Sequence, residues 1–370
     1  MNPERDLFLH RRHAGRGRGK LPGTDNYIPC EMRVFGNQQP GGPLTASGNS
    51  FMAQGGHGNA GDLPPERSRY PWGKDPSRDA VHPGVIFTRP DFGALREAGY
   101  TPVDMHFHTI HTDGLVSIRD LLSRVRARGI GCAVTDHNEV SGAVHACRER
   151  GDLPVIPGIE VSAMDGPHLL LWFSSPRDLE DFFQRHIRDR RCESPWLLTR
   201  LTTAEVLEAA DGYSCVRAPA HPYGYLIFNG GLAKCIEKGY LDRELYGRCE
   251  AVEGICANMT HRENLRAVAL ALRLNLPVTG GSDGHLLSDL GTAVTCARAD
   301  SPEEFLEELR KGSARVVGRE KHLPAKLFTG AVISARFLPW FYPSLKIHCG
   351  GAGRRMHRYL SKRRSPARRG

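Results

Sequence analysis

The sequence predicts an α/β fold, a parallel TIM-like barrel of seven strand–helix units, and three observations support this prediction. Short apolar runs alternate with helical patterns between about residues 85 and 335, which is typical of repeated βα units. Seven of these runs are strand-like, a number that suits a closed (β/α)7 barrel. Histidines and carboxylates stand at the ends of several runs, where the chemistry of such barrels gathers.

The individual elements follow from local patterns. Ser117 and Ser301 each precede a helical pattern and are good N-caps. The expected strands are 101–107, 131–137, 153–161, 168–173, 214–221, 251–257 and 276–283. The expected helices are 117–129, 176–189, 202–212, 261–275 and 301–312.

The two ends of the chain differ from this middle part. Glycine and proline occupy 22 of the first 80 positions without apolar periodicity, which predicts a disordered N-terminal extension over 1–80; a translation start assigned too far upstream is the alternative. Residues 336–370 are expected to form a basic C-terminal tail, since 354–370 hold eight Arg/Lys and no acid. The barrel domain is therefore expected over 85–335.

Charge and cysteine usage restrict the class of protein. The formal charge of +9 resides at the ends, because 1–80 contribute +3 and 354–370 contribute +8, leaving 9 − 3 − 8 = −2 for the middle. A basic surface for nucleic acid over the whole molecule is therefore not indicated. The sequence has no apolar run of bilayer length and no secretory h-region. Its ten cysteines are scattered without a CxxC pair, which favours reduced thiols and a cytoplasmic location with no membrane partner.

Residues that bind metals recur at the strand ends. Strand alternation places His106 and His108 on one face, where both imidazoles can reach one ion. Nitrogen and oxygen ligands of this kind suit Zn, Mn or Fe. The candidate ligands, in chain order, are His106, His108, Asp113, His137, Glu160, His168, His221, Asp283 and His285.

The ordered motifs DMHFHTIHTDG, AVTDHN, GIEVS, PAHP and GGSDGH resemble those of the PHP superfamily, named for polymerase and histidinol phosphatase. The resemblance covers roughly residues 101–320. It implies a distorted seven-stranded barrel (the PHP fold), two or three divalent metal ions, and hydrolysis of phosphoesters. Carried over by motif, the first ion would be held by His106, His108, Glu160 and Asp283. Glu160 would bridge to a second ion that His168 and His221 also bind, and Asp113, His137 and His285 would hold a third.

The chemistry of such a centre is hydrolytic. Clustered divalent ions lower the pKa of a bridging water, which supplies a hydroxide nucleophile, and they neutralise charge on the phosphoryl oxygens. Glu160, Asp283 and His285 are therefore the predicted catalytic residues. The sequence leaves open whether a residue in the ligand sphere or water protonates the leaving group.

Other polar residues are expected to support the site. His111 falls on the opposite face from His108, which predicts a supporting or surface role, and Asp104 is a candidate to orient a ligand imidazole. Asp136 and Asn138 are expected to help in the same way, while His145 and His261 lie in helical patterns away from the site. Phosphate binding is predicted for Arg217, Arg190 and Arg191, the last two in a cluster with Arg185 and Arg188. The segment 184–213 is expected to set substrate selectivity.

Three functions remain open from the sequence. The first is hydrolysis of a small phosphorylated metabolite or nucleotide. The second is exonuclease activity on RNA or DNA ends, with the basic tail holding short nucleic acid. The third is a non-catalytic binding module, which the near-complete ligand set disfavours. A related amidohydrolase is disfavoured because no lysine stands at a predicted strand end, whereas a non-phosphate ester substrate and the oligomeric state stay open.

Overall fold

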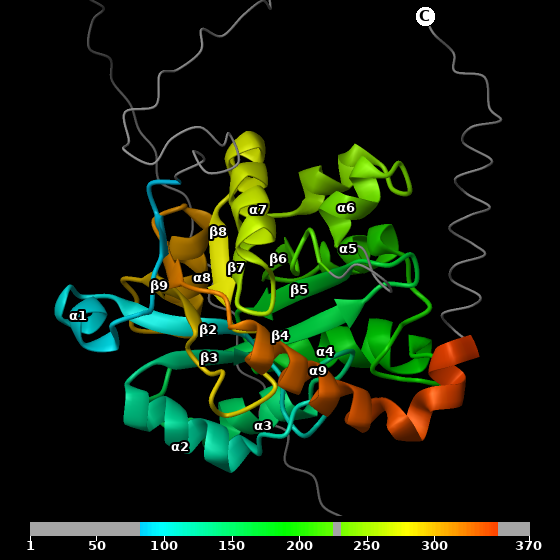
Figure 1. Ribbon diagram of the computed structural model, residues 1–370, viewed down its shortest axis with the longest axis horizontal. Coiled ribbons are helices and arrows are strands. Elements are labelled where there is room, and N and C mark those ends of the chain that lie inside the picture. Colours follow the sequence, from blue (N-terminus) through cyan, green and yellow to red (C-terminus); the bar gives the residue numbers. More distant parts are fainter. Residues whose placement is uncertain (1–81, 225–230, 347–370) are drawn as a thin grey trace, which may run out of the picture. The chain divides into compact units, whose positions relative to one another are not determined.

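A computed structural model of the chain describes residues 82–224 and 231–346. The predicted extension at 1–80 lies outside these described residues, as do residues 347–370 of the predicted tail at 336–370. The first part of that tail, 336–346, is described and is helical. The strands belong to an eight-stranded mixed sheet and a two-stranded sheet, with helices on both flanks (Figure 1). In chain order the strands are β1 (Val85–Phe87), β2 (Thr101–Phe107), β3 (Gly131–Val134), β4 (Val155–Ser162), β5 (His168–Phe173), β6 (Cys215–Pro219), β7 (Val252–Cys256), β8 (Val278–Gly281), β9 (Ala293–Ala297) and β10 (Arg315–Gly318).

The seven predicted strands are all present as β2 to β8, and β2 has the predicted bounds. Strands β1, β9 and β10 were not predicted. They extend the sheet beyond β2, so the larger sheet has the order β1-β10-β9-β2-β3-β4-β5-β6, and β7 and β8 form the second sheet. The fold is therefore a mixed α/β structure with more strands than the predicted barrel.

The expectation of an all-parallel barrel was wrong at β5. Strands β2, β3 and β4 are mutually parallel, as are β7 and β8, but β5 is antiparallel to both β4 and β6. Only residues 163–167 connect β4 to β5. A parallel connection needs about a dozen residues or more to cross over, so this short link requires a hairpin.

Backbone hydrogen bonds join the two sheets at both ends. The amide of His108, just after β2, donates to the carbonyl of Gly284, just after β8, at 2.8 Å. At the other end the amide of Glu250, before β7, donates to the carbonyl of Arg217 in β6, also at 2.8 Å. The strands β2 to β8 therefore follow one curved surface, and their ends meet at one place (Figure 1).

The predicted helix caps are confirmed. The side chain of Ser117 accepts from the amide of Asp120, and that of Ser301 accepts from the amide of Glu304, which satisfies amides that the first turn leaves unpaired. The predicted helix at 176–189 is α-helical only to Phe182 and continues as a π turn and a 3₁₀ turn. The helices are α1 (Phe92–Glu97), α2 (Ile118–Arg128), α3 (Ser141–Glu149), α4 (Pro176–Phe182), α5 (Thr203–Ala210), α6 (Leu232–Glu237), α7 (His261–Leu274), α8 (Pro302–Arg310) and α9 (Leu323–Phe337).

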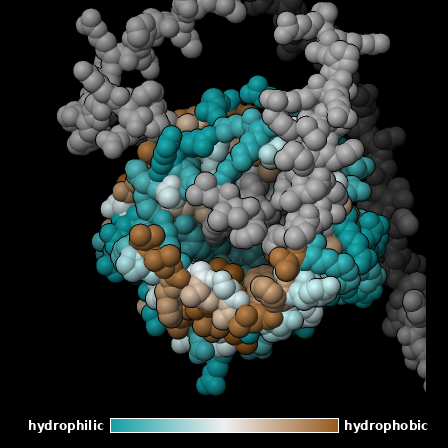
Figure 2. Space-filling view, turned by 45° about the vertical axis from the view of Figure 1, so that its right-hand side comes forward, coloured by the Kyte–Doolittle hydropathy of each residue, from teal (hydrophilic) through white to brown (hydrophobic). Residues whose placement is uncertain are grey.

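Exposed apolar side chains gather on α9 and the residues that follow it. Leu327 and Phe328 in α9 are 66% and 60% exposed, and Phe341 and Tyr342 beyond it are 65% and 74% exposed. Apolar residues form a band on the face of the molecule drawn in Figure 2. None of the helices within 82–224 and 231–346 combines the length and hydrophobicity that crossing a bilayer requires.

Candidate metal centre

The strand ends bring the predicted ligands into one cluster. A bridge pairs His137, after β3, with Glu160 in β4, and another pairs Phe107 in β2 with Gly284 after β8. These pairings align side chains that are far apart in sequence. Seven of the nine predicted ligands are buried, and the side chains of His137 and His168 are 12% and 11% exposed. The structure therefore places all nine predicted ligands around a common buried centre: His106, His108, Asp113, His137, Glu160, His168, His221, Asp283 and His285.

Two of these residues have an unusual backbone conformation. His221 and Asp283 have φ angles of 28° and 48°, and Asn138, next to His137, has a φ of 52°. Non-glycine residues rarely adopt positive φ, because the side chain crowds the backbone. Such conformations persist where the surrounding structure holds them, and they concentrate at functional sites.

The first group of ligand atoms lies between β2 and the end of β8. His106 Nε2 and His108 Nε2 are 3.1 Å apart. Glu160 Oε2 lies 3.3 Å and 3.4 Å from these two nitrogens, and Asp283 Oδ1 lies 3.6 Å and 3.2 Å from them. The four residues that the resemblance assigns to a first ion therefore face one point.

The second group forms around the other oxygen of Glu160. Oε1 lies 3.0 Å from His168 Nδ1 and 3.1 Å from His221 Nε2. Because Oε2 faces the first group, the two oxygens of one carboxylate serve two neighbouring groups of histidines. This is the arrangement expected of a bridging carboxylate.

The third group centres on Asp113. Its Oδ2 lies 3.3 Å from His285 Nε2 and 3.6 Å from His137 Nε2, and its Oδ1 lies 3.8 Å from His108 Nδ1. His137 also approaches Glu160, with its Nδ1 3.0 Å from Oε2. The three groups therefore adjoin one another, because Glu160, His108 and His137 each contact atoms of more than one group.

The donor atoms fit divalent cations. Among the described residues, His108 Nδ1, Glu160 Oε2 and His285 Nε2 are buried and make no hydrogen bond, which is costly unless a ligand satisfies them. The Nε2 atoms of His106 and His108 face each other. In a neutral imidazole one ring nitrogen donates and the other accepts. Because Nδ1 of His106 donates to Glu253, its Nε2 is an acceptor and has no hydrogen to donate to His108. A cation between these atoms would satisfy both, and imidazole with carboxylate suits Zn, Mn or Fe.

Opposite charges shape the ionisation of the centre. Burial would raise the pKa of Glu160 and of Asp283, but the surrounding histidines outweigh burial and hold both well below their usual range. Burial together with His285 and His137 lowers the pKa of His108 to about 4. Carboxylates remain charged and His108 remains neutral at neutral pH, which are the forms that bind metals.

A carboxylate that sequence reasoning missed supports the first group. Glu253 in β7 accepts from His106 Nδ1 at 2.8 Å and from the amide of His221 at 2.5 Å. Because Nδ1 of His106 then donates, its Nε2 is free to bind a cation, the usual arrangement of a ligand histidine. Glu253 is the one carboxylate in the otherwise apolar run AVEGICA, and this was the signal that could have found it.

Asp104 and Asp136 hold backbone rather than imidazoles. Asp104 accepts from the amides of Ser282 at 2.8 Å and Gly291 at 2.7 Å, and burial raises its pKa to about 6. Asp136 accepts from the amide of Thr109 at 2.7 Å and from the hydroxyl of Thr112 at 2.7 Å. Both carboxylates thus fix the loops on which the ligands stand.

Helix α9 reaches the same ligand loop from the far end of the chain. Arg336 donates to the carbonyl oxygens of Ile110 and Thr112 at 2.9 Å and 2.6 Å. Its guanidinium also lies 5.5 Å from the centre of the Trp196 ring. Asn138 donates to the carbonyl of Trp196 at 3.2 Å, so the segment around Trp196 lies between α9 and the centre. No local sequence pattern could identify Arg336, because the two carbonyl oxygens to which it donates are more than 200 residues away.

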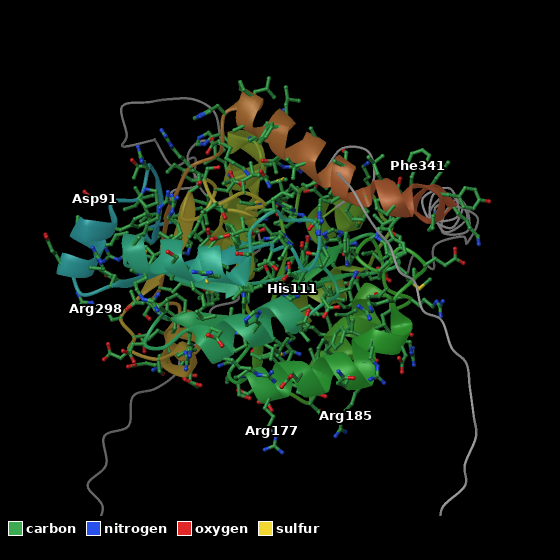
Figure 3. All side chains as sticks on the ribbon, turned by 90° about the horizontal axis from the view of Figure 1, so that it is seen from below. Asp91, His111, Arg177, Arg185, Arg298 and Phe341 are labelled. Atoms are coloured by element: carbon green, nitrogen blue, oxygen red, sulfur yellow. The ribbon has the colours of Figure 1, made fainter. Side chains whose placement is uncertain are left out.

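The remaining histidines of the sequence analysis lie outside the centre. His111 is half-buried and contacts the hydroxyl of Ser141 at 2.8 Å (labelled in Figure 3). His261 pairs with Glu320 at 2.7 Å. His145, which lies on α3, faces the ring of His111 edge-on. No contact joins these three histidines to the nine candidate ligands within the described ranges.

The predicted phosphate-binding arginines differ in their ion pairs and in their exposure. Arg191 pairs with Glu139 at 2.8 Å, two residues after His137. Arg217 pairs with Glu250 at 3.1 Å and with Asp211. Arg190 is exposed, and Arg185 of the same cluster points away from the molecule (Figure 3). A phosphate-binding role for Arg217, Arg190 and Arg191 stays a prediction.

The chain matches one family model. Residues 261–314 match the model described as PHP-associated, and this segment contains Asp283 and His285. The match confirms the predicted resemblance to the PHP superfamily over well under half of the chain. No curated protein matches the sequence.

Several solved structures are similar in fold. The lesion-specific endonuclease PfuEndoQ from Pyrococcus furiosus has 15% identity and a TM-score of 0.48, with 59% of this chain and 57% of the endonuclease covered. A metal-dependent phosphoesterase from Bifidobacterium adolescentis, described as putative, has 20% identity and a TM-score of 0.40, with 60% and 98% covered. PsfC from Pseudomonas syringae has 16% identity and a TM-score of 0.46, with 64% and 99% covered.

The chain spans 57% of the length of the first of these proteins. Likenesses of this size assign no activity to the chain. Its similarity to the PHP superfamily therefore rests on the ordered motifs and on the PHP-associated match, and the buried centre is where those motifs converge.

Proposed function

We propose that the chain is a metal-dependent phosphoesterase that hydrolyses a small phosphorylated metabolite or nucleotide. The observation that carries this proposal is the position of Glu160. Its Oε2 faces His106 and His108, while its Oε1 faces His168 and His221. One carboxylate between two sets of imidazoles is a donor arrangement that suits a cluster of divalent ions.

The residues that would hold the ions are those of the three groups. His106, His108, Glu160 and Asp283 would hold the first; Glu160, His168 and His221 the second; Asp113, His137 and His285 the third. When bound, divalent ions activate water near neutral pH and neutralise charge on the phosphoryl oxygens. We propose two or three such ions, with zinc, manganese and iron as the candidate metals.

Glu160, Asp283 and His285 are the proposed catalytic residues. The surrounding histidines outweigh burial and favour the charged forms of Glu160 and Asp283, which are the forms that would bind a cation. Nδ1 of His285 lies 3.0 Å from the carbonyl of Asp283. A proton on Nδ1 would donate to that carbonyl, which orients Nε2 toward Asp113.

The substrate is expected to approach past His137 and His168, whose side chains are 12% and 11% exposed while the side chains of the other ligands are at most 5% exposed. The segment around Trp196 adjoins this side, because Asn138 bonds to it. Arg191 adjoins it through Glu139. Segment 184–213 therefore remains our candidate for substrate selectivity, with Arg191 as a candidate cation for a phosphate group.

Metal analysis of the purified protein, followed by a screen of phosphomonoesters, phosphodiesters and short oligonucleotides, tests the proposal. We expect bound Zn, Mn or Fe and release of phosphate from small substrates. His106→Ala and Asp283→Ala should each abolish turnover, whereas His145→Ala, a histidine outside the centre, should retain it. Full activity of either centre variant would exclude the assignment.

The same screen decides between the alternatives. Stepwise shortening of oligonucleotides, with no turnover of small substrates, would favour the exonuclease. Absence of both metal and activity across the panel would favour a non-catalytic module. Turnover of carboxylic esters alone would place the scissile bond outside phosphoester chemistry.

A further inference from the structure

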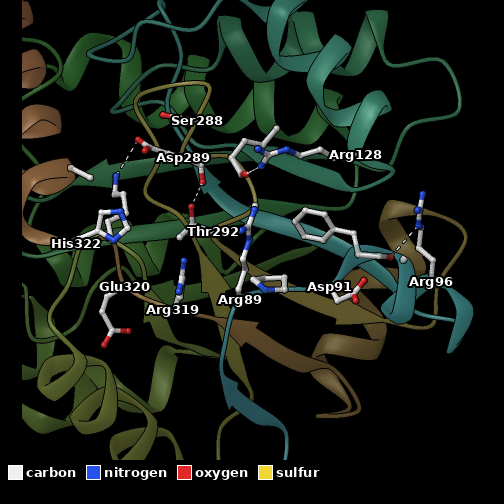
Figure 4. Close-up of a pocket in the computed structure, with 17 residues that line it drawn as sticks. Arg89, Asp91, Arg96, Arg128, Ser288, Asp289, Thr292, Arg319, Glu320 and His322 are labelled. Carbon is white, nitrogen blue, oxygen red and sulfur yellow. Dashed lines mark hydrogen bonds and ion pairs between the residues drawn. The ribbon is translucent and has the colours of Figure 1, made fainter.

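A cavity lies outside the metal centre. It has a volume of about 890 Å³ and is formed by the start of α1, the end of α2, residues 288–292, and the residues between β10 and α9 (Figure 4). None of the nine candidate metal ligands lines it. The cavity therefore has its own lining, although Asp289 in this lining accepts from the amide of the candidate ligand His285 at 3.2 Å.

Strand topology explains why basic residues meet there. β1 and β10 are parallel neighbours, with Phe87 opposite Gly318. Arg89 and Arg319 follow these two strands and so emerge from the same end of the sheet. Thr292, which accepts from the amide of Arg319 at 3.3 Å, immediately precedes β9. Crevices at the carboxyl ends of parallel strands are common ligand sites in α/β proteins.

The carboxylates of the cavity are already engaged. Asp289 pairs with Lys321 at 3.0 Å, Glu320 pairs with His261 at 2.7 Å, and Asp91 accepts from the amide of Ala94 at 3.1 Å as the cap of α1. None of the three forms an ion pair with an arginine of the cavity in the described part of the chain. Counting Arg89, Arg96, Arg128, Arg319 and Lys321 against Asp91, Asp289 and Glu320, the lining has a formal charge of 5 − 3 = +2.

The four arginines of the lining have no carboxylate partner among the described residues. The side chains of Arg89 and Arg319 make neither an ion pair nor a hydrogen bond with any residue of the described chain. Arg128 donates to the carbonyl of Leu290, and burial with the nearby Arg124 and Arg89 lowers its pKa. In Figure 4 the side chains of Arg89 and Arg128 approach each other, and Arg319 lies on the side of Arg89 toward His322. An anion between these groups would relieve their mutual repulsion.

We propose that this cavity binds the polyphosphate group of a small molecule. Guanidinium groups match phosphate oxygens with paired hydrogen bonds, which makes arginine the preferred residue for phosphate recognition. The excess charge of the lining calls for a ligand with at least two negative charges. A nucleoside triphosphate and inorganic polyphosphate share this chemistry, and the test separates them.

Calorimetric titration of the full-length protein tests the proposal, with excess magnesium present so that the probes do not strip metal from the centre. The probes are inorganic tripolyphosphate and a non-hydrolysable adenosine triphosphate analogue. We expect both to bind, and Arg89→Gln/Arg319→Gln to weaken binding at least tenfold, because the charge-assisted hydrogen bonds of both guanidinium groups are lost. Equal affinities would indicate that the phosphates alone are recognised, and tighter binding of the nucleotide would identify a nucleotide site.

Two control proteins separate this cavity from general electrostatics and from the metal centre. Arg119→Gln/Arg177→Gln removes the same charge from two exposed positions outside the cavity and should bind within twofold of wild type. Asp283→Ala, which alters the centre, should also bind within twofold. No binding to the wild type, unchanged affinity of Arg89→Gln/Arg319→Gln, or loss of binding in Asp283→Ala would each overturn the proposal. The first two outcomes leave the phosphoesterase proposal intact, so the two stand or fall separately.

Discussion

Arg336 holds the backbone of Thr112, the residue before Asp113. Its Nη2 and Nε lie 2.6 Å and 3.2 Å from the carbonyl oxygen of Thr112. The hydroxyl of Thr112 in turn donates to Asp136 at 2.7 Å. The position of a candidate metal ligand thus depends on a helix near the end of the described chain.

Replacement of Arg336 by alanine should weaken metal binding at the Asp113 group. Loss of its bonds lets the loop move, and outer residues of metal sites typically contribute about 10- to 100-fold in affinity. Metal titration should show one ion bound more weakly, with the others unchanged. Arg336→Lys should restore part of the affinity, and Ser334→Ala, a change on the same helix, should have no effect. Equal metal affinity in Arg336→Ala and wild type would contradict this role.

Glu253→Gln should weaken metal binding at the first group of ligands. The amide keeps the shape of the carboxylate but removes the negative charge that His106 Nδ1 contacts at 2.8 Å. We expect a fall of about 10- to 100-fold in metal affinity, measured by competition with a chelator. Glu250→Gln, three residues earlier and paired with Arg217, is the matched control. If both variants lost affinity equally, a general charge effect would replace the proposed contact.

Gly281→Ala should disrupt the centre through His106. A Cβ at Gly281, at the end of β8, would lie 2.7 Å from the backbone nitrogen of His106, closer than real contacts allow, so β2 or β8 must shift. We expect loss of metal and activity, measured by metal content after purification. Gly212→Ala, where a Cβ meets nothing within 4 Å, should behave as wild type. Full metal occupancy in Gly281→Ala would show that the strands can separate without loss of the site.

Lys321→Met should lower stability strongly. Lys321 and Asp289 form an ion pair of 3.0 Å whose side chains are 5% and 6% exposed, and removal of one partner of a buried pair typically costs about 3–5 kcal/mol. Denaturant unfolding measures the change. The double variant Lys321→Met/Asp289→Asn should recover part of it, because no uncompensated charge remains. A double variant no more stable than Lys321→Met would show that the ion pair is not the cause.

Chelation should lower the melting temperature of the wild-type protein. A ligand at about 100 times its Kd stabilises the folded state by about 2.7 kcal/mol, which corresponds to several degrees for a domain of this size. Differential scanning fluorimetry with and without chelator checks this. The shift should be smaller in His106→Ala/Asp283→Ala. Equal shifts in both proteins would mean that the stabilising metal binds elsewhere.

Local patterns predicted the candidate ligands that the structure gathers into one buried cluster, and metal binding by them stays a prediction. His106 and His108 lie two apart at the end of a strand, and Asp283 and His285 follow another strand, so alternation and strand order predict that they converge. The caps at Ser117 and Ser301 are local as well and were also predicted. The sequence therefore determined which side chains form the centre, because each of these signals spans only a few neighbouring residues.

Tertiary structure alone decided how the centre is supported. Glu253 meets His106 across 147 residues, and Arg336 meets Thr112 across 224, so no local pattern reports either contact. The direction of β5, in contrast, could have been predicted from the sequence, because the predicted strands 153–161 and 168–173 leave too few residues between them for a parallel crossover. Arg89 and Arg319 adjoin because β1 pairs with β10, a pairing between the two ends of the described fold. Contacts over such separations depend on the order of the strands in the sheet. The residues of one strand do not determine which other strand lies next to it.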